Sequence, residues 1–275
     1  MSRQAGAKRF MTGGCAKAAS WQENHGGEMA DPCPRIGSRA NFSGLTATTG
    51  YLCPMDTLLP ALEVGAPRGE TELTVLLLHG LGADGHDFEE VAAELSRAAE
   101  PRKWRFVLPH APARKVTINL GMKMPAWYDI LDLSQPRAVD WGTVEESARS
   151  IEALMAREPA DRLILAGFSQ GAAMALHVGL RHPDRIAGIL MMSGYLLTGE
   201  NHPCPPKTVD FPMGIFHGSL DPVVPQTAAE QAVEALQEHG YAPTLKTYPG
   251  LEHSVSDDEL RDVFAWLTRV DSALG

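Results

Sequence analysis

The stretch Gly167-Phe168-Ser169-Gln170-Gly171 decides the fold of this 275-residue chain. It follows an apolar run, Leu163 to Ala166, that is typical of a buried strand, and it leads into a segment of small residues, Ala172 to Leu176, that is typical of a helix. A G-x-S-x-G pattern between a strand and a helix is typical of a nucleophile elbow, a sharp turn that presents a serine hydroxyl at the edge of a sheet. The glycines leave room for that turn. The sequence therefore predicts Ser169 as a nucleophile; the alternative is a tight turn with an ordinary serine.

Apolar, strand-like runs alternate with helical patterns from Leu73 to the C-terminus. Strands are expected at 73–78, 104–108, 163–166, 186–192, 213–216 and 244–247. Helices are expected at about 86–99, 143–157, 170–181, 227–239 and 256–270, the last of them opening with the capping box Ser256-Asp257-Asp258-Glu259. This alternation predicts an α/β fold with a mostly parallel central sheet and helices on both faces. In such a sheet the loops at the carboxyl ends of the strands gather the active site.

Composition limits the partners that this chain can have. The formal net charge of -10 at pH 7 argues against non-specific binding of nucleic acid or of an anionic membrane surface. No apolar run approaches the roughly 18 residues of a membrane span, so stable insertion into a membrane is not expected. The four cysteines have no metal-ligand spacing, so we expect no metal site, and a reducing cytoplasm is the expected location.

The first 54 residues differ from the rest of the chain. They are rich in Gly, Ala, Ser and Thr and show no helical or strand periodicity. Such a composition predicts a disordered N-terminal extension at 1–54, followed by a catalytic domain at 55–275. Met55 is then the expected start of the folded protein, and a targeting role for the preceding segment is the alternative.

A serine hydroxyl is a weak nucleophile near neutral pH and needs an adjacent base. Among the ten histidines, only His253 lies after the last predicted strand, where the Ser…Asp…His order of elbow-containing folds places the base. The alternative for His253 is a histidine on a surface loop. Asp221 follows a predicted strand between Ser169 and His253 and would hold the imidazole in the correct tautomer. Its alternatives are a simple turn at Asp221-Pro222 and a role for Asp210, which precedes its strand and so lies toward the opposite edge.

A glycine-rich loop, His79-Gly80-Leu81-Gly82-Ala83-Asp84-Gly85, follows the first predicted strand. Backbone N–H groups in this loop, together with the N–H of Gln170, are placed to stabilise a developing oxyanion. The same loop matches the G-x-G-x-x-G pattern of dinucleotide sites. That alternative requires an acidic residue about 20 residues further on, where the chain reads Pro101-Arg102-Lys103-Trp104, and we reject it.

Five motifs follow one another along the chain: His79–Gly85, Ala126–Asp129, Gly167–Gly171, His217–Asp221 and Gly250–His253. Together they resemble the phospholipase/carboxylesterase family, which includes small bacterial carboxylesterases and acyl-protein thioesterases, from about residue 55 to the C-terminus. The resemblance implies an α/β-hydrolase fold without a large cap domain and a triad of Ser169, Asp221 and His253. It also implies an oxyanion hole formed by the N–H groups of Leu81 and Gln170, a small-molecule ester or thioester as substrate, and no cofactor.

The substrate is harder to predict. The long connection from His110 to about Gly142 contains Met124 and Trp127, whose apolar side chains are candidates to line an acyl pocket. The alternative is that Trp127 packs this loop onto the sheet. A pocket made of loops favours short or medium acyl chains, so we expect a carboxylesterase. An acyl-protein thioesterase, a lysophospholipase and a catalytically silent ligand receptor on the same fold are the alternatives, and a homodimer stays open.

Overall fold

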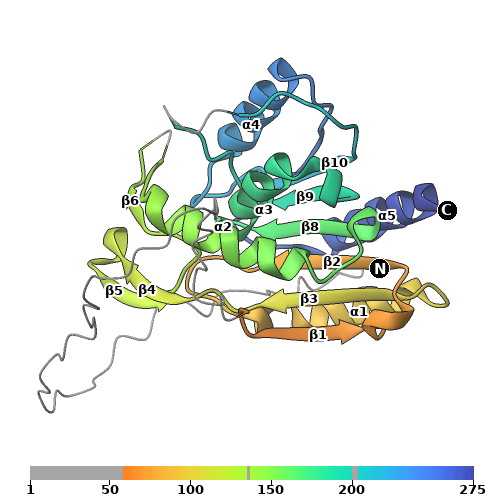
Figure 1. The fold of residues 1–275 in the computed structure, drawn as a ribbon. Helices are drawn as coiled ribbons and strands as arrows, with labels where there is room; N and C mark the ends of the chain where they lie inside the picture. The colour runs from red at the N-terminus through yellow and green to blue at the C-terminus, as the bar shows by residue number, and fades with distance from the viewer. Residues whose placement is uncertain (1–57, 135–136, 200–203) are drawn as a thin grey trace, which may run out of the picture.

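The computed structural model describes residues 58–134, 137–199 and 204–275 (Figure 1). The predicted extension at 1–54 lies outside these ranges and stays a prediction. In the part of the chain that the model describes, no helix has the length and apolar character needed to cross a membrane.

A seven-stranded sheet forms the centre of the molecule, in the strand order β1-β3-β2-β8-β9-β10-β11. All neighbouring strands are parallel except the pair β1 and β3. The predicted mostly parallel sheet is confirmed. Its strands are β1 (Ala61–Gly65), β2 (Leu73–Leu78), β3 (Trp104–Pro109), β8 (Leu163–Phe168), β9 (Gly188–Met192), β10 (Met213–Gly218) and β11 (Thr244–Tyr248).

Helices cover both faces of this sheet, as predicted (Figure 1). Strand β2 shows why: Leu76 and Leu78 belong to the apolar core on one face, while Val75 and Leu77 belong to the core on the other. Burial of each such side chain contributes about 1.5–3 kcal/mol, so both faces need a helical layer. On the Leu76 side lie α2 (Trp141–Met155), α3 (Gln170–Arg181) and α4 (Gln226–Glu238); on the Val75 side lie α1 (Glu89–Ala99) and α5 (Asp257–Leu274).

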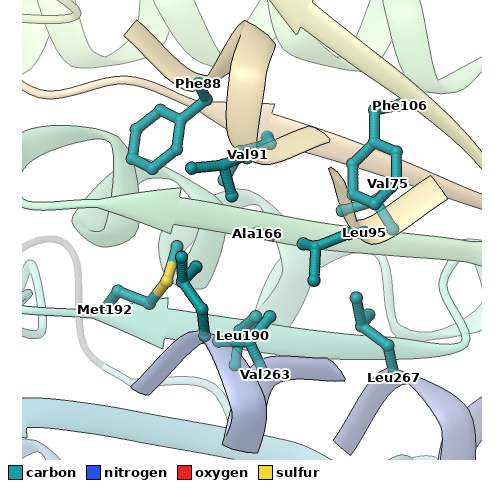
Figure 2. A pocket seen from close by; sticks show the side chains of 12 residues that line it. Val75, Phe88, Val91, Leu95, Phe106, Ala166, Leu190, Met192, Val263 and Leu267 are labelled. Carbon is teal, nitrogen blue, oxygen red and sulfur yellow. The ribbon is translucent and has the colours of Figure 1, made fainter. Parts of the chain in front are cut away.

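The layer formed by α1 and α5 is tightly packed against the sheet. Figure 2 shows the small cavity that remains there, with Val91 and Leu95 of α1 facing Val263 and Leu267 of α5. Its lining is entirely apolar and its volume is about 10 Å³, which is the space of about one water molecule. This cavity is a packing defect and is too small for an acyl chain.

The structure differs from the sequence-based expectation mainly at the sheet edge and in the connection 110–142. Edge strand β1 was not predicted, because its half-buried residues give a weaker apolar signal than the strands that are buried on both faces. The connection, expected as one loop, contains two hairpins: β4 (Ala113–Val116) with β5 (Met122–Pro125), and β6 (Ile130–Asp132) with β7 (Ala138–Val139). Short 3-10 helices lie at Arg68–Glu70, Gly85–Phe88, Thr117–Asn119, Ala160–Arg162 and Pro183–Arg185.

Candidate active site

The turn between β8 and α3 holds Ser169 in a strained backbone conformation. Its φ angle is +56°, in the left-handed region that side chains other than glycine rarely adopt. The N–H of Ser169 donates to the carbonyl of Met192 at the end of β9, at 2.9 Å. A Cβ atom at Gly171 would overlap the carbonyl oxygen of Leu78, and one at Gly167 would overlap that of Gly171. The close approach of α3 to β2 therefore requires Gly171, and the sharp turn from β8 into α3 requires Gly167.

Three side chains from different loops form a hydrogen-bonded series at this edge of the sheet. His253, on the loop between β11 and α5, has Nε2 at 2.9 Å from Oγ of Ser169 and Nδ1 at 2.6 Å from Oδ2 of Asp221. An ionised carboxylate only accepts hydrogen bonds, so Nδ1 carries the proton and Nε2 is free to accept the proton of the serine hydroxyl. Asp221 lies in the turn after β10. The structure thus brings together the three residues that the sequence nominated.

Asp221 is held in its ionised form although its side chain is buried. Burial opposes ionisation, but the hydrogen bond and charge of His253 and two backbone N–H groups outweigh it and lower the pKa of Asp221 below its ordinary value. Those two donors are Val223 and Val224, each 2.8 Å from Oδ1. The neighbouring His217 is fully buried, and burial lowers its pKa, so its neutral ring donates to the carbonyl of Val224 at 2.8 Å.

The structure distinguishes Asp221 from Asp210 and shows the role of the Asp221-Pro222 turn. Asp210 is exposed and pairs with Lys207 at 2.8 Å, away from the histidine. The Asp221-Pro222 turn does form, and it is this turn that directs the N–H groups of Val223 and Val224 at the carboxylate. The sequence did not indicate these two donors, although the Asp-Pro dipeptide was the available signal.

The loop after β2 lies against the elbow. A Cβ atom added to Gly80 would be 3.5 Å from Cβ of Ser169, so the two turns are in close contact. The N–H of Gly82 donates to Pro125 at 2.9 Å and that of Ala83 to Gly80 at 3.3 Å. The N–H of Gln170 is the first in α3 and has no acceptor within the helix. These positions are compatible with the predicted oxyanion hole of Leu81 and Gln170.

Two residues were nominated to contact the substrate. Trp127 is 0% exposed, which favours the alternative that it packs its loop onto the sheet. Met124 is partly buried, and its sulfur lies near Gly82, beside the predicted oxyanion loop. Contact of either residue with substrate stays a prediction. Within the described ranges, no group of three or more His, Cys, Asp or Glu side chains is arranged to hold a metal ion.

The chain is similar to known proteins over most of its described length. The model of the phospholipase/carboxylesterase family matches residues 59–270. The chain is 36% identical over 223 residues to acyl-protein thioesterase 1 of Neurospora crassa, covering 76% of this chain and 91% of that protein.

Solved structures show the same architecture. Acyl-protein thioesterase 2 of Zea mays superposes with a TM-score of 0.64 at 26% identity, covering 78% of this chain and 99% of that one. The esterase PE8 superposes with a TM-score of 0.63 at 28% identity, covering 78% of this chain and all of the other. The molecule therefore has the α/β-hydrolase fold, as predicted.

Proposed function

Because this chain belongs to the phospholipase/carboxylesterase family of serine hydrolases, we propose that it cleaves acyl esters and thioesters through an acyl-enzyme on Ser169. One observation carries the proposal: the hydrogen-bonded series from Ser169 through His253 to an ionised Asp221, placed on a strained elbow. A nucleophile, a base within hydrogen-bond reach and a group that orients the base are what acyl transfer requires.

The proposed reaction has two steps. Nε2 of His253 takes the proton of the Ser169 hydroxyl while Oγ attacks the substrate carbonyl, and the N–H groups of Leu81 and Gln170 stabilise the oxyanion. His253 then gives this proton to the leaving alcohol or thiol as the C–O or C–S bond breaks. In the second step His253 takes a proton from a water molecule as its oxygen attacks the carbonyl of the acyl-enzyme. His253 then returns this proton to Oγ of Ser169 as the carboxylic acid is released.

For the substrate, we propose an acyl thioester on a protein or peptide in preference to a short or medium ester. The sequence alone favours an ester as substrate, but the named relatives of this chain include acyl-protein thioesterases. The surface beside Asp221 is also apolar, since Leu220 and Val223 are 65% and 51% exposed. Such a surface suits an acyl chain presented from a large partner.

Competing substrates separate these functions in one experiment. Turnover is compared for a palmitoylated peptide thioester, a lysophospholipid and p-nitrophenyl esters of increasing chain length, with wild type and Ser169→Ala. We expect the highest kcat/KM on the thioester and no turnover by Ser169→Ala. Preference for a short ester would restore carboxylesterase as the function, and preference for the lysophospholipid would make the protein a lysophospholipase. A silent receptor would turn over none of them and would not be labelled by a fluorophosphonate.

We also propose that residues 55–275 form the catalytic domain. The match of the family model to residues 59–270 supports this boundary. A variant that begins at Met55 should keep the kcat and melting temperature of the full chain. Loss of activity on removing residues 1–54 would refute the boundary.

A further inference from the structure

The side chain of Gln170 has no role in the proposed chemistry, yet Gln170 is 1% exposed and both polar atoms of its amide form hydrogen bonds. Its Oε1 accepts from the N–H of Trp127 at 2.8 Å, and its Nε2 donates to the carbonyl of Tyr128 at 2.8 Å. Because one backbone group donates and the other accepts, the side chain must both accept and donate, as this amide does in this orientation. These two hydrogen bonds join the first residue of α3 to the segment between β5 and β6.

The same segment is also hydrogen-bonded to the loop after β2. The indole Nε1 of Trp127 donates to the carbonyl of His79 at 2.8 Å, and the two rings are 5.2 Å apart. The ring of His79 donates from Nδ1 to Gly80 at 2.8 Å and accepts from the N–H of Ala111 at 3.0 Å. Burial lowers the pKa of His79 to about 4, so this arrangement persists at neutral pH. His79 is two residues from Leu81.

We propose that the Gln170 amide and the Trp127 indole are positioning groups that fix the two oxyanion donors relative to one another. One donor is the N–H of Gln170 itself, and the other is the N–H of Leu81. The connection between them runs from the Gln170 amide to the backbone of Trp127 and from its indole to the carbonyl of His79. This inference rests on the proposed function, because it assigns a purpose to the supports of the same oxyanion hole.

Physical considerations favour this role over simple packing. Oxyanion donors act by being held in place before charge develops, so their effect depends on supports that keep them fixed. The N–H of Leu81 lies on a loop, and a loop needs such a support more than a strand or helix does. Trp127 is 0% exposed, and its indole is held against this loop by the hydrogen bond to the carbonyl of His79.

Two variants of Gln170 test the proposal. Gln170→Met keeps the length of the side chain and removes both hydrogen bonds, and we expect kcat to fall about 10- to 100-fold, less than the loss of a whole donor, with KM within about two-fold of wild type. Gln170→Glu keeps the bond to the N–H of Trp127, but an ionised carboxylate cannot donate to Tyr128. A protonated glutamic acid can, so the activity of Gln170→Glu relative to wild type should rise as the pH falls from 8 to 5.

Two titratable side chains of the segments joined to Gln170, His79 and Tyr128, keep one protonation state in that range. His79 stays neutral above pH 5 because burial lowers its pKa to about 4, and burial raises the pKa of Tyr128 well above its ordinary value. The guanidinium of Arg114 donates to the carbonyl of Ala126 in the same segment between β5 and β6. The activity of Gln170→Met relative to wild type should therefore show no such rise.

Trp127→Phe and Trp104→Phe form a matched pair. Both tryptophans are 0% exposed and both donate one buried hydrogen bond, but Trp104 donates to Asp271 on the α5 side of the sheet at 2.9 Å. Both variants should lower the melting temperature, and only Trp127→Phe should lower kcat, by about ten-fold if the Leu81 donor is displaced and not lost.

The outcomes separate this inference from the proposed function. Hydrolysis by wild type that is lost in Ser169→Ala establishes the function independently of Gln170. Given that result, unchanged kcat in folded Gln170→Met and Trp127→Phe would overturn the positioning role. Equal losses of kcat in Trp127→Phe and Trp104→Phe would overturn it as well. If Gln170→Met does not fold, the pH dependence of Gln170→Glu decides, since a flat ratio to wild type contradicts the proposal.

Discussion

Two buried carboxyl groups at the same edge of the sheet differ in their ionisation. Asp221, in the turn after β10, has its carboxylate bonded to His253 and to two backbone N–H groups, and its pKa lies below the ordinary value. Glu259, in the first turn of α5, is 0% exposed, and among the described residues its carboxyl oxygens have no hydrogen-bond partner of good geometry.

The pKa of Glu259 moves in the opposite direction. Burial raises it to about 8; the backbone of Ser256 opposes this rise, while the charges of Asp262 and Asp221 add to it. Directed hydrogen-bond donors, and not burial as such, therefore decide which carboxyl group is ionised. At neutral pH, Asp221 can orient and stabilise an imidazolium, whereas Glu259 is a protonated core residue.

The largest effect is expected for Asp221→Asn. The amide keeps an oxygen for the N–H groups of Val223 and Val224, so the turn should fold, but its NH₂ group would face Nδ1 of His253 and favour the wrong tautomer. We expect kcat to fall about 10⁴-fold. Steady-state kinetics on the preferred substrate check this, and a loss of less than ten-fold would show that Asp221 does not orient the base.

Next in size is the effect of Glu259→Gln on the pH dependence of stability. In wild type the unfolded chain loses the Glu259 proton near pH 4.3, whereas the folded protein keeps it to about pH 8, so stability falls as pH rises between these values, by on the order of a few kcal/mol. Urea unfolding at pH 5 and pH 9 should show a smaller decrease for Glu259→Gln. Identical decreases would mean that Glu259 is paired in solution.

A smaller effect on the pH dependence of stability, opposite in sign to that of Glu259→Gln, is expected for Asp221→Asn in acid. Because the folded pKa of Asp221 is lowered, its contribution to stability is present above the unfolded pKa of about 3.9 and is lost as pH falls through the folded value. Asp221→Asn should remove this part of the acid-induced loss. Acid unfolding followed by tryptophan fluorescence tests it; curves that stay parallel to wild type below pH 4 would contradict the assignment.

The smallest effect concerns Asp262, whose charge helps to raise the pKa of Glu259. Asp262 is partly exposed and pairs with Lys246, so Asp262→Asn should change overall stability by less than about 1 kcal/mol. The same variant should move the pH at which Glu259 loses its proton downward, as measured by the pH dependence of urea unfolding. No movement, or an upward one, would show that the two groups are not coupled.

The regular parts of the fold were predictable because their signals are local. The bounds of α3 at Gln170–Arg181 coincide with the predicted 170–181, since the elbow before it marks the first helical residue. The predicted N-terminus of the last helix is confirmed: the Ser256 hydroxyl accepts from the N–H of Glu259, and α5 begins at Asp257. Edge strand β1 depends on pairing with the distant β3, and the hairpins of the 110–142 connection are built from very short strands, so these were missed.

The candidate site was predictable to the same extent. Ser169, Asp221 and His253 could be chosen from the order of the chain, because parallel strands place their following loops at one edge. The amide of Gln170 reaches residues 42 and 43 positions away, a contact that no periodicity encodes. The burial of the Glu259 carboxyl group likewise depends on how α5 packs against the sheet, and the sequence indicates only a helix cap.

Ser169 is the proposed nucleophile, and covalent labelling identifies the side chain that reacts. A fluorophosphonate is added in small steps, and intact mass, peptide mapping and residual turnover are followed together. We predict one adduct per chain, on the peptide that contains Ser169, with turnover lost in proportion and no labelling of Ser169→Ala. Turnover that survives complete labelling, or an adduct on another residue, would show that Ser169 is not the nucleophile.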